Sequence, residues 1–342
     1  MKLGLALGYW GAGPPADTAE LVAAAEQSGL DSIWTAEAYG SDALTPLAFH
    51  AATTSRVRLG TNIAQLSGRT PAATAMAAIT LDHLSGGRMV LGLGASGPQV
   101  VEGWYGQPYP KPLARTREYI EILRRIFARQ GPVEFAGEHY TLPYPGGAGL
   151  GKPLKSTVHP LRADLPIHLA AEGPKNVALA AEIADGWLPF FFSPSADAFY
   201  RAALDEGFAR PGARRTRAEF EVAAFVPTVV GDDVETAADA IRPMIALYVG
   251  GMGAKAVNFH LDVFARLGYD KACAEIQERY LAGDKAGAAA AVPTAMVEDV
   301  ALVGPAAKIG EDLHRWRTTT IDTLIVNGPA AQLAALTPYF DL

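Results

Sequence analysis

The stretch PIHLAAEGPKNVALAAEIADGW, residues 166–187, decides how this chain folds. Residues 167–171 form a short apolar run that is typical of a strand, and Glu172 and Gly173 interrupt it. Pro174 then stands where a helix often begins, because a proline at the first helical position loses no intrahelical hydrogen bond. Apolar residues at helical spacing fill the rest of the stretch. The pattern predicts a strand, a tight turn and a helix.

The start of this predicted helix is a candidate anion site. The N–H groups of Gly173, Lys175 and Asn176 are expected to lack intrahelical partners and to lie beyond the C-terminal end of the strand. The positive end of the helix dipole favours an anion there, and Lys175 adds a full positive charge. An ordinary strand–turn–helix junction without a ligand explains the same residues equally well.

The composition of the 342 residues narrows the classes of protein to consider. Apolar residues make up 49% and charged residues 19%, which predicts a large core and little disorder. The net charge of −7 and the scattered basic residues argue against a nucleic-acid partner. A single cysteine, Cys273, rules out an internal disulfide, and histidines that are never paired four residues apart on a helix argue against a metal site.

Two features of the sequence indicate where in the cell the protein is found. No apolar run approaches the roughly 20 residues of a membrane span. The apolar residues near the N-terminus are too few for a signal sequence and read as a strand. We therefore expect a cytoplasmic protein without a membrane partner.

Strand-like and helical segments alternate along the chain. This α/β pattern, with eight strands in one register, favours a (β/α)8 TIM barrel over an open doubly wound sheet. We expect one domain, residues 1–342, with insertions at about 131–165, which begins with a hairpin, and at about 251–300. A single helix is predicted over 232–248. The eight strands are predicted at residues 3–7, 32–35, 58–63, 89–93, 167–171, 186–190, 221–230 and 323–326.

Active sites of such barrels lie at the C-terminal ends of the strands. This rule selects residues 9–10, 37–39, 62–65, 94–97, 171–176 and 189–192.

Motifs at these strand ends and along the whole chain resemble the bacterial luciferase-like superfamily. Within it, the chain is most similar to oxidoreductases that use the deazaflavin coenzyme F420. No single motif decides this, but the ordered set is fairly specific. The motifs are TAEAY (35–39), RLGTNI (58–63), GRTP (68–71), LSGGRMVLGLG (84–94), FAGEHYTL (135–142), AAEGPKN (170–176), ADGW (184–187) and VGP (303–305).

The resemblance implies a flavin-like ring, that of F420, at the barrel mouth, with the cofactor phosphate at the helix start of residues 173–176. It also implies a cis peptide between Asn62 and Ile63, a homodimer and a small-molecule substrate. On this resemblance, the expected cofactor-binding residues are Asn62, Ile63, Gly94, Ala95, Ser96, Ala171, Glu172, Gly173, Pro174, Lys175 and Asn176.

The chain departs from the family pattern at two strand ends. Many relatives carry an acid followed by histidine after the second strand, where this chain has Glu37-Ala38. An acid that many sugar-phosphate dehydrogenases carry after the fourth strand is missing from residues 95–98. Hydride transfer between F420 and some other small organic substrate is the favoured function. An FMN-dependent monooxygenase and a catalytically silent cofactor-binding barrel are the alternatives.

Glu37 and Tyr39 are the candidate catalytic residues. A carboxylate at position 37 could relay a proton beside the bound ring, and the phenol of Tyr39 could donate a hydrogen bond. A capping or ion-paired acid and simple aromatic packing are the alternatives for these two positions. His168 is expected inside the barrel as a core histidine. Candidates to grip an anionic cofactor tail, unless they are only solvated, are Arg69, Lys111, Lys152 and Lys155.

Overall fold

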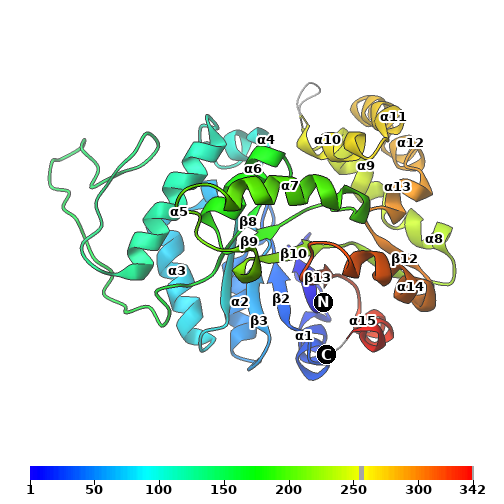
Figure 1. Cartoon of the computed structure of the whole chain (residues 1–342), viewed down its shortest axis with the longest axis horizontal. Helices are drawn as coiled ribbons and strands as arrows, with labels where there is room; N and C mark the ends of the chain where they lie inside the picture. Colours follow the sequence, from blue (N-terminus) through cyan, green and yellow to red (C-terminus); the bar gives the residue numbers. More distant parts are fainter. Residues whose placement is uncertain (254–257, 341–342) are drawn as a thin grey trace.

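Eight parallel strands close into a barrel in the computed structural model, which describes residues 1–253 and 258–340 (Figure 1). The last strand pairs with the first, and β3 pairs with β5, so the ring is complete. This closure confirms the TIM barrel and rules out the open sheet. Around the barrel the strands are β1 (Lys2–Gly8), β2 (Ser32–Thr35), β3 (Arg58–Thr61), β5 (Met89–Gly94), β8 (Ile167–Ala170), β9 (Gly186–Leu188), β10 (Glu221–Phe225) and β13 (Thr323–Val326).

Helices follow the strands and cover the outside of the barrel. Their starts obey local rules: Thr70 caps α3 by accepting the N–H of Ala73 at 3.2 Å, and Pro71 opens its first turn. None of the described helices is long and apolar enough to cross a membrane. The barrel helices are α1 (Thr18–Gln27), α2 (Leu44–Ala51), α3 (Pro71–Leu84), α5 (Pro112–Ala128), α6 (Pro174–Ile183), α7 (Asp197–Phe208), α14 (Ala306–Arg317) and α15 (Ala330–Leu336).

The first insertion carries the predicted hairpin. Strands β6 (Phe135–Ala136) and β7 (Thr141–Leu142) pair antiparallel, and the rest of the segment is irregular. Figure 1 shows this segment reaching out on the left of the view, beyond α5.

The second insertion is helical, as expected, and lies at the other end of the molecule (Figure 1). It has its own apolar cluster, which includes Phe264, Ile276 and Met296 and reaches the barrel through Phe191. The helices of this region are α8 (Val234–Asp239), α9 (Arg242–Gly250), α10 (Phe259–Arg266), α11 (Asp270–Leu281), α12 (Lys285–Ala290) and α13 (Thr294–Glu298).

Two predicted elements are split by prolines. The strand predicted over 221–230 ends at Phe225, and after Pro227 the chain leaves the barrel as β11 (Thr228–Val230), which pairs with β12 (Leu302–Gly304). The helix predicted over 232–248 is two helices, α8 and α9, and Pro243 lies in the first turn of the second. Proline lacks the N–H that a continuous ladder or helix needs. The short α4 (Pro98–Gly103) was not predicted.

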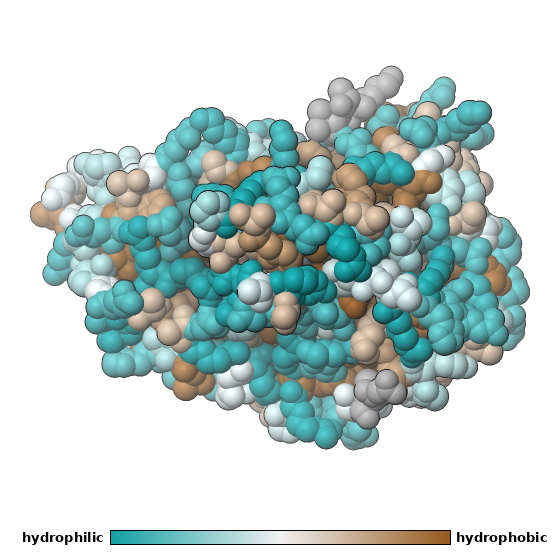
Figure 2. All heavy atoms as spheres, viewed as in Figure 1, coloured by the Kyte–Doolittle hydropathy of each residue, from teal (hydrophilic) through white to brown (hydrophobic). Residues whose placement is uncertain are grey.

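The barrel interior is apolar in its middle and polar at the N-terminal ends of the strands. The middle layer consists of Trp34, Val90, Leu188, Ala223 and Ile325. Polar residues cover most of the face that Figure 2 shows, so the exposed apolar side chains are scattered there. The C-terminal end of the barrel lies above this layer, at the end where active sites of such barrels are found.

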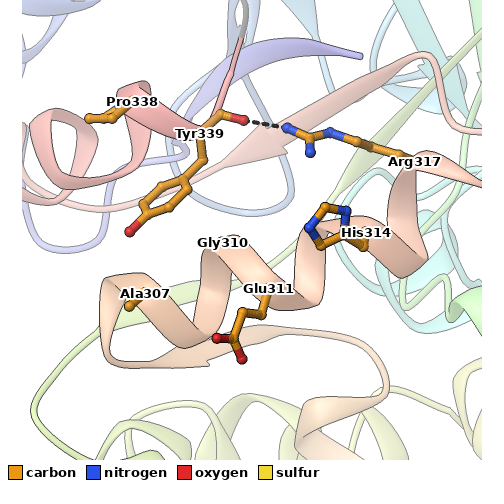
Figure 3. A pocket seen from close by; sticks show the side chains of 7 residues that line it. All are labelled: Ala307, Gly310, Glu311, His314, Arg317, Pro338 and Tyr339. Carbon is orange, nitrogen blue, oxygen red and sulfur yellow. Dashed lines mark hydrogen bonds between the residues drawn. The ribbon is translucent and has the colours of Figure 1, made fainter.

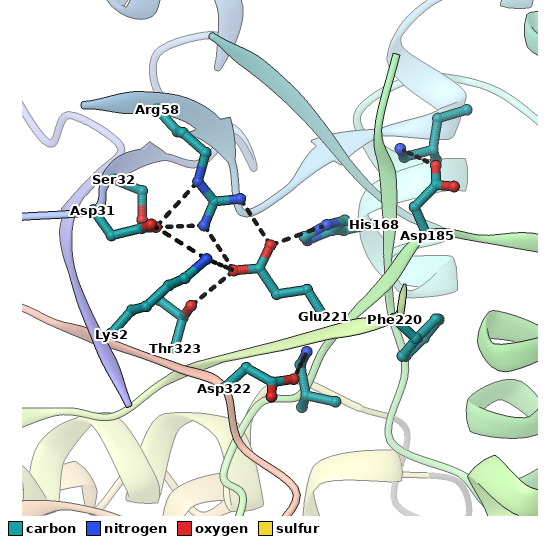
Figure 4. Close-up of polar contacts among 12 residues, drawn as sticks. Lys2, Asp31, Ser32, Arg58, His168, Asp185, Phe220, Glu221, Asp322 and Thr323 are labelled. Carbon is teal, nitrogen blue, oxygen red and sulfur yellow. Dashed lines mark hydrogen bonds and ion pairs between the residues drawn. The ribbon is translucent and has the colours of Figure 1, made fainter. Parts of the chain in front are cut away.

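A polar cluster fills the N-terminal end of the barrel (Figure 4). Both guanidinium Nη atoms of Arg58 donate to Glu221 at 2.7 Å, and Arg58 also pairs with Asp31. His168 is buried in the barrel, as expected, with Nε2 3.6 Å from Glu221. Burial lowers the pKa of His168, although the charge of Glu221 opposes this shift. His168 is thus part of the structural cluster and lies away from the mouth.

Candidate functional site

The floor of the barrel mouth consists of four partly buried apolar residues. Ala6, Ile63, Ala170 and Phe225 pack on the middle layer of the interior. Three of them belong to β1, β8 and β10, and Ile63 lies between β3 and the next short strand. Apolar side chains of this kind can pack against one face of a planar ring.

The peptide bond between Asn62 and Ile63 is cis, as the resemblance implied. The side chain of Ile63 lies against Gly94, where an added Cβ would be 2.9 Å from Cδ1 of Ile63. A side chain at position 94 would therefore displace Ile63 from the floor. Ala95 and Ser96 follow at the same strand end and are partly exposed, and the carbonyl of Ser96 accepts the Tyr109 hydroxyl at 2.6 Å. The structure thus brings these five cofactor-binding candidates together at the C-terminal ends of neighbouring strands.

The turn between β8 and α6 has the predicted form. Trp187 holds the turn in place, since its indole N–H donates to the carbonyl of Ala171 at 2.8 Å. An added Cβ on Gly173 would meet nothing within 4 Å, and Lys175 is exposed. One detail differs from the prediction. The N–H of Asn176 donates to the carbonyl of Gly173 at 3.0 Å, because the first turn of α6 closes there, so it is not free.

Two donors remain at this helix start. Within residues 1–253 and 258–340, the N–H groups of Gly173 and Lys175 have no hydrogen-bond acceptor. Pro174, between them, has no N–H to satisfy. These two N–H groups, the ammonium of Lys175 and the helix dipole together form a candidate anion site.

Glu37 is buried and fully engaged by other protein groups. Its carboxylate accepts the N–H of Gln65 at 2.7 Å and that of Ala43 at 3.1 Å. Nη1 of Arg69 lies 2.7 and 2.9 Å from its two oxygens. Burial alone would lower the pKa of Arg69, but the hydrogen bond and charge of Glu37 raise it. These contacts favour an anchoring role for Glu37 over a proton relay.

Tyr39 is more than half exposed at the rim of the mouth, with Tyr9 nearby. Burial of Tyr9, followed by the charge of Tyr39, raises the pKa of the Tyr9 phenol. Of the four candidates for a cofactor tail, Arg69 is paired with Glu37 and Lys111 with Glu138. The remaining two, Lys152 and Lys155, are exposed on the first insertion.

A second group of residues lies at the mouth, and the sequence did not point to two of its members, His260 and Tyr248. Nδ1 of His260, on α10, lies 2.8 Å from Oε1 of Glu172. The His260 ring also packs against Tyr248 and Phe190, with centroids 4.7 and 5.9 Å away. The local sequence cannot predict the contact between His260 and Glu172. The reason is that α10 belongs to the second insertion and lies near Glu172 only in the folded chain. Glu172, an expected cofactor-binding residue, and Phe190 were both within strand ends that the barrel rule selects.

Other features of the described residues carry no comparable chemistry. They contain no group of three or more potential metal-ligating side chains. A surface groove of about 420 Å³ lies between α14 and the segment of Pro338 and Tyr339 (Figure 3). His314 lines it, but this groove lies on the outside of the barrel, among residues that do not follow a barrel strand.

Comparison with known protein families shows which family this chain belongs to. The profile of the luciferase-like monooxygenase family matches residues 4–323. The chain belongs to this family. The match confirms the resemblance that the strand-end motifs indicated.

Several relatives of this luciferase-like protein carry names that refer to F420 or to a reductase. A Mycobacterium tuberculosis protein named "Putative coenzyme F420-dependent oxidoreductase" is 57% identical over 98% of this chain and 99% of its own length. A 5,10-methylenetetrahydromethanopterin reductase of Archaeoglobus fulgidus is 29% identical over 89% of this chain and 87% of its own. Among solved structures, the coenzyme F420-dependent tetrahydromethanopterin reductase of Methanopyrus kandleri has a TM-score of 0.80 at 23% identity, covering 100% of this chain and 98% of that one.

Proposed function

We propose that this protein is a coenzyme F420-dependent oxidoreductase, which transfers a hydride between the deazaflavin and a small organic substrate. The observation that carries the proposal is the 57% identity, over nearly the whole chain, to a protein whose name specifies that cofactor and that class of reaction. The enzyme class and the cofactor rest on this similarity. The substrate and the hydride-transfer step go beyond it and are part of the proposal.

The residues at the mouth fit a deazaflavin cofactor. Ile63 and Ala170 would lie under its ring, and Gly94 leaves space for Ile63 to do so. The N–H groups of Gly173 and Lys175 would donate hydrogen bonds to the first phosphate of its side chain. The remaining cofactor-binding candidates, Asn62, Ala95, Ser96, Ala171, Glu172, Pro174 and Asn176, would line the path between the two.

A bound deazaflavin would supply the hydride, since it is a two-electron carrier. The protein would hold the ring against the floor, orient the substrate above it and handle one proton. Glu37 would act on this site through structure, because its carboxylate joins the end of β2 to the backbone of Gln65 and to Arg69. Tyr39 remains a proposed hydrogen-bond donor at the rim.

The cofactor retained by the protein tests this proposal. We expect protein purified from a host that makes both F420 and FMN to carry F420, identified by the absorption spectrum and the mass of the released cofactor. Release of FMN, together with oxygen consumption when the protein is reduced, would contradict the proposal and support a monooxygenase. A protein that binds F420 but transfers no hydride to or from it would support a catalytically silent cofactor-binding barrel, and a protein that binds neither cofactor would refute the proposal.

We further propose that the chain is a single domain, as the alternation of strands and helices predicted, and that it forms a homodimer, as the family resemblance implied. Sedimentation velocity at micromolar concentration would show a dimer. A monomer that still binds F420 would refute the dimer and leave the proposed function intact.

A further inference from the structure

The part of the first insertion that follows β7 forms an extended arm, residues 143–163. Figure 1 shows the insertion reaching out beyond α5. The second half of the arm is fixed to two barrel helices. Nε of Arg129, at the end of α5, donates to the carbonyl of Ser156 at 2.9 Å, and Nε of Arg162 donates to Asp82 of α3 at 3.1 Å. The arm is therefore anchored at α5 and α3 and projects from there.

The first half of the arm, residues 143–153, has little support from its own chain. It makes no hydrogen bond to any other part of residues 1–253 and 258–340. One close approach is within the arm itself, where an added Cβ on Gly151 would lie 3.3 Å from Cβ of Pro143. A segment of this kind gains most of its contacts when it packs against another molecule.

Large apolar side chains gather on the arm, and water surrounds them. Leu150 is 85%, Tyr144 75% and Leu154 69% exposed. Val158 and Leu161, nearer the anchored end, are also exposed. A group of exposed apolar side chains in one short segment marks an interaction site, whereas single exposed apolar residues do not.

The exposed apolar surface continues from the arm onto α3. Nε2 of His83 on this helix lies 2.8 Å from the carbonyl of His159 on the arm, and Leu84 follows directly. No lysine, arginine, aspartate or glutamate is exposed along α3, and depletion of charge is typical of protein interfaces. The exposed residues of this helix are Ala73, Met76, Thr80, His83 and Leu84.

The arm is basic, whereas the rest of the chain is acidic. The arm contains Lys152, Lys155 and Arg162 and no acidic residue, so it carries +3. Since the whole chain carries −7, the rest carries −10. Arg162 pairs with Asp82, but Lys152 and Lys155 have no acidic partner within the described residues. A second copy of the chain offers an acidic body to these two lysines. An anionic membrane would attract the lysines but repel the body.

We propose that the arm packs against a second copy of this chain, so that each protomer of a dimer is held by the arm of the other. This inference rests on the homodimer put forward with the proposed function. A two-fold contact is reciprocal, so every contact of the arm occurs twice. The arm and the exposed side of α3 together supply roughly the 20–30 residues that a standard interface takes from each partner.

Leu150→Asp tests the apolar part of the contact in the full-length protein. A side chain central to an interface is worth about 30-fold in affinity, and this one would be present twice. We therefore expect the dissociation constant of the dimer to rise about 10³-fold, measured by sedimentation velocity over a range of concentrations. Leu281→Asp makes the same change at an exposed leucine of the second insertion and should leave the dimer unchanged.

Lys152→Glu combined with Lys155→Glu tests the charge. We expect this double variant to form a weaker dimer than the wild type, and the difference to shrink at high salt. Thermal unfolding of each variant separates a lost contact from a lost fold. The unfolding temperature should stay at that of the wild type for Leu150→Asp at concentrations where both are monomers, because position 150 has no contact with the body to lose.

Two results would overturn the inference: a wild type that is monomeric, or a Leu150→Asp variant that dimerises as tightly as the wild type. Co-sedimentation with vesicles of phosphatidylserine and phosphatidylcholine tests a membrane as the partner. Vesicle binding that Leu150→Asp abolishes, with the dimer intact, would also overturn it. F420 titration of the same samples keeps the proposed function separate. Leu150→Asp should still bind F420, whereas a wild type that dimerises through the arm without binding F420 would refute only the proposed function.

Discussion

At the scale of single residues, Glu37 was predicted to be catalytic, but its contacts in the fold are those of a structural residue. It follows the second strand, where relatives carry an acid, and this made it a candidate proton relay. In the fold its carboxylate is 4% exposed and meets Arg69 and two backbone N–H groups. A carboxylate with this many donors is held in one position.

Glu37→Gln tests the two roles. The change removes the partner of Arg69 and places an amide N–H against backbone donors, so we expect a loss of about 3 kcal/mol in the free energy of unfolding. Turnover per bound cofactor should stay within a few-fold of the wild type. Urea denaturation and single-turnover kinetics measure the two quantities. A drop of about 10²–10⁴ in turnover with stability intact would restore the relay.

Lys175 is the exposed cation at the candidate phosphate site. We predict that Lys175→Ala weakens F420 binding about 2- to 5-fold, the range expected of one solvated charge pair, and that the difference shrinks at high salt. Lys152→Ala, which removes an equally exposed lysine from the first insertion, is the matched control. An equal loss of F420 affinity in both variants would show that only the net charge of the protein matters. It would contradict a phosphate site at the start of α6.

At the scale of elements, α10 is the one that places His260. Asn258 caps this helix by accepting the N–H groups of His260 and Leu261 at 3.0 and 3.1 Å. Its amide also donates to the carbonyls of Tyr248 and Val249 at the end of α9. One buried side chain therefore sets the position of α10 relative to α9, and hence of His260 relative to Tyr248.

Asn258→Ala should cost about 2 kcal/mol, because a helix cap and two further hydrogen bonds are lost together. The amide hydrogens of His260 and Leu261 should exchange faster, as measured by hydrogen–deuterium exchange. Asp284→Ala removes the cap of α12, which accepts the N–H of Gly287 at 2.8 Å, and should leave these two amides protected. Unchanged exchange at α10 in Asn258→Ala would show that the cap does not hold the helix.

The elements also show what local sequence can predict. The alternation of apolar strand-like and helical segments predicted the barrel, and Gly173-Pro174 predicted the start of α6. Both predictions succeeded because these features depend on residues that are close together in the sequence. Pro227 and Pro243 carried a readable signal for the split strand and helix, since proline interrupts a ladder or a helix. The pairing of Glu172 with His260 had none, because it depends on where the second insertion packs.

At the scale of the whole molecule, the two ends of the barrel have different roles. The N-terminal end is closed by a cluster that joins four strands: Arg58 on β3, Glu221 on β10, Thr323 on β13 and His168 on β8 (Figure 4). The C-terminal end has an apolar floor and a candidate anion site. Ionic closure at one end leaves the other free to bind a ligand.

Glu221→Gln should lower the free energy of unfolding by about 3–5 kcal/mol, since it leaves Arg58 partly unpaired. Burial alone would raise the pKa of Glu221, but the hydrogen bonds of Arg58 and the nearby charges hold it well below its ordinary 4.5. The stabilisation is therefore present above pH 4.5 and is lost as the pH falls through the lowered pKa. Urea denaturation measures the difference in the free energy of unfolding between the wild type and Glu221→Gln. This difference should be constant from pH 7 to about 5 and should become smaller at lower pH. A difference that widens in acid would contradict this account.

The central claim is that this barrel is built for F420, and comparative titration tests it most directly. Fluorescence titration of the apoprotein with F420 and with FMN, at one ionic strength, gives the two dissociation constants. We predict tighter binding of F420, and weaker binding of F420 to Lys175→Ala than to the wild type. Tighter binding of FMN, or no binding of F420 at any concentration tested, would contradict the claim.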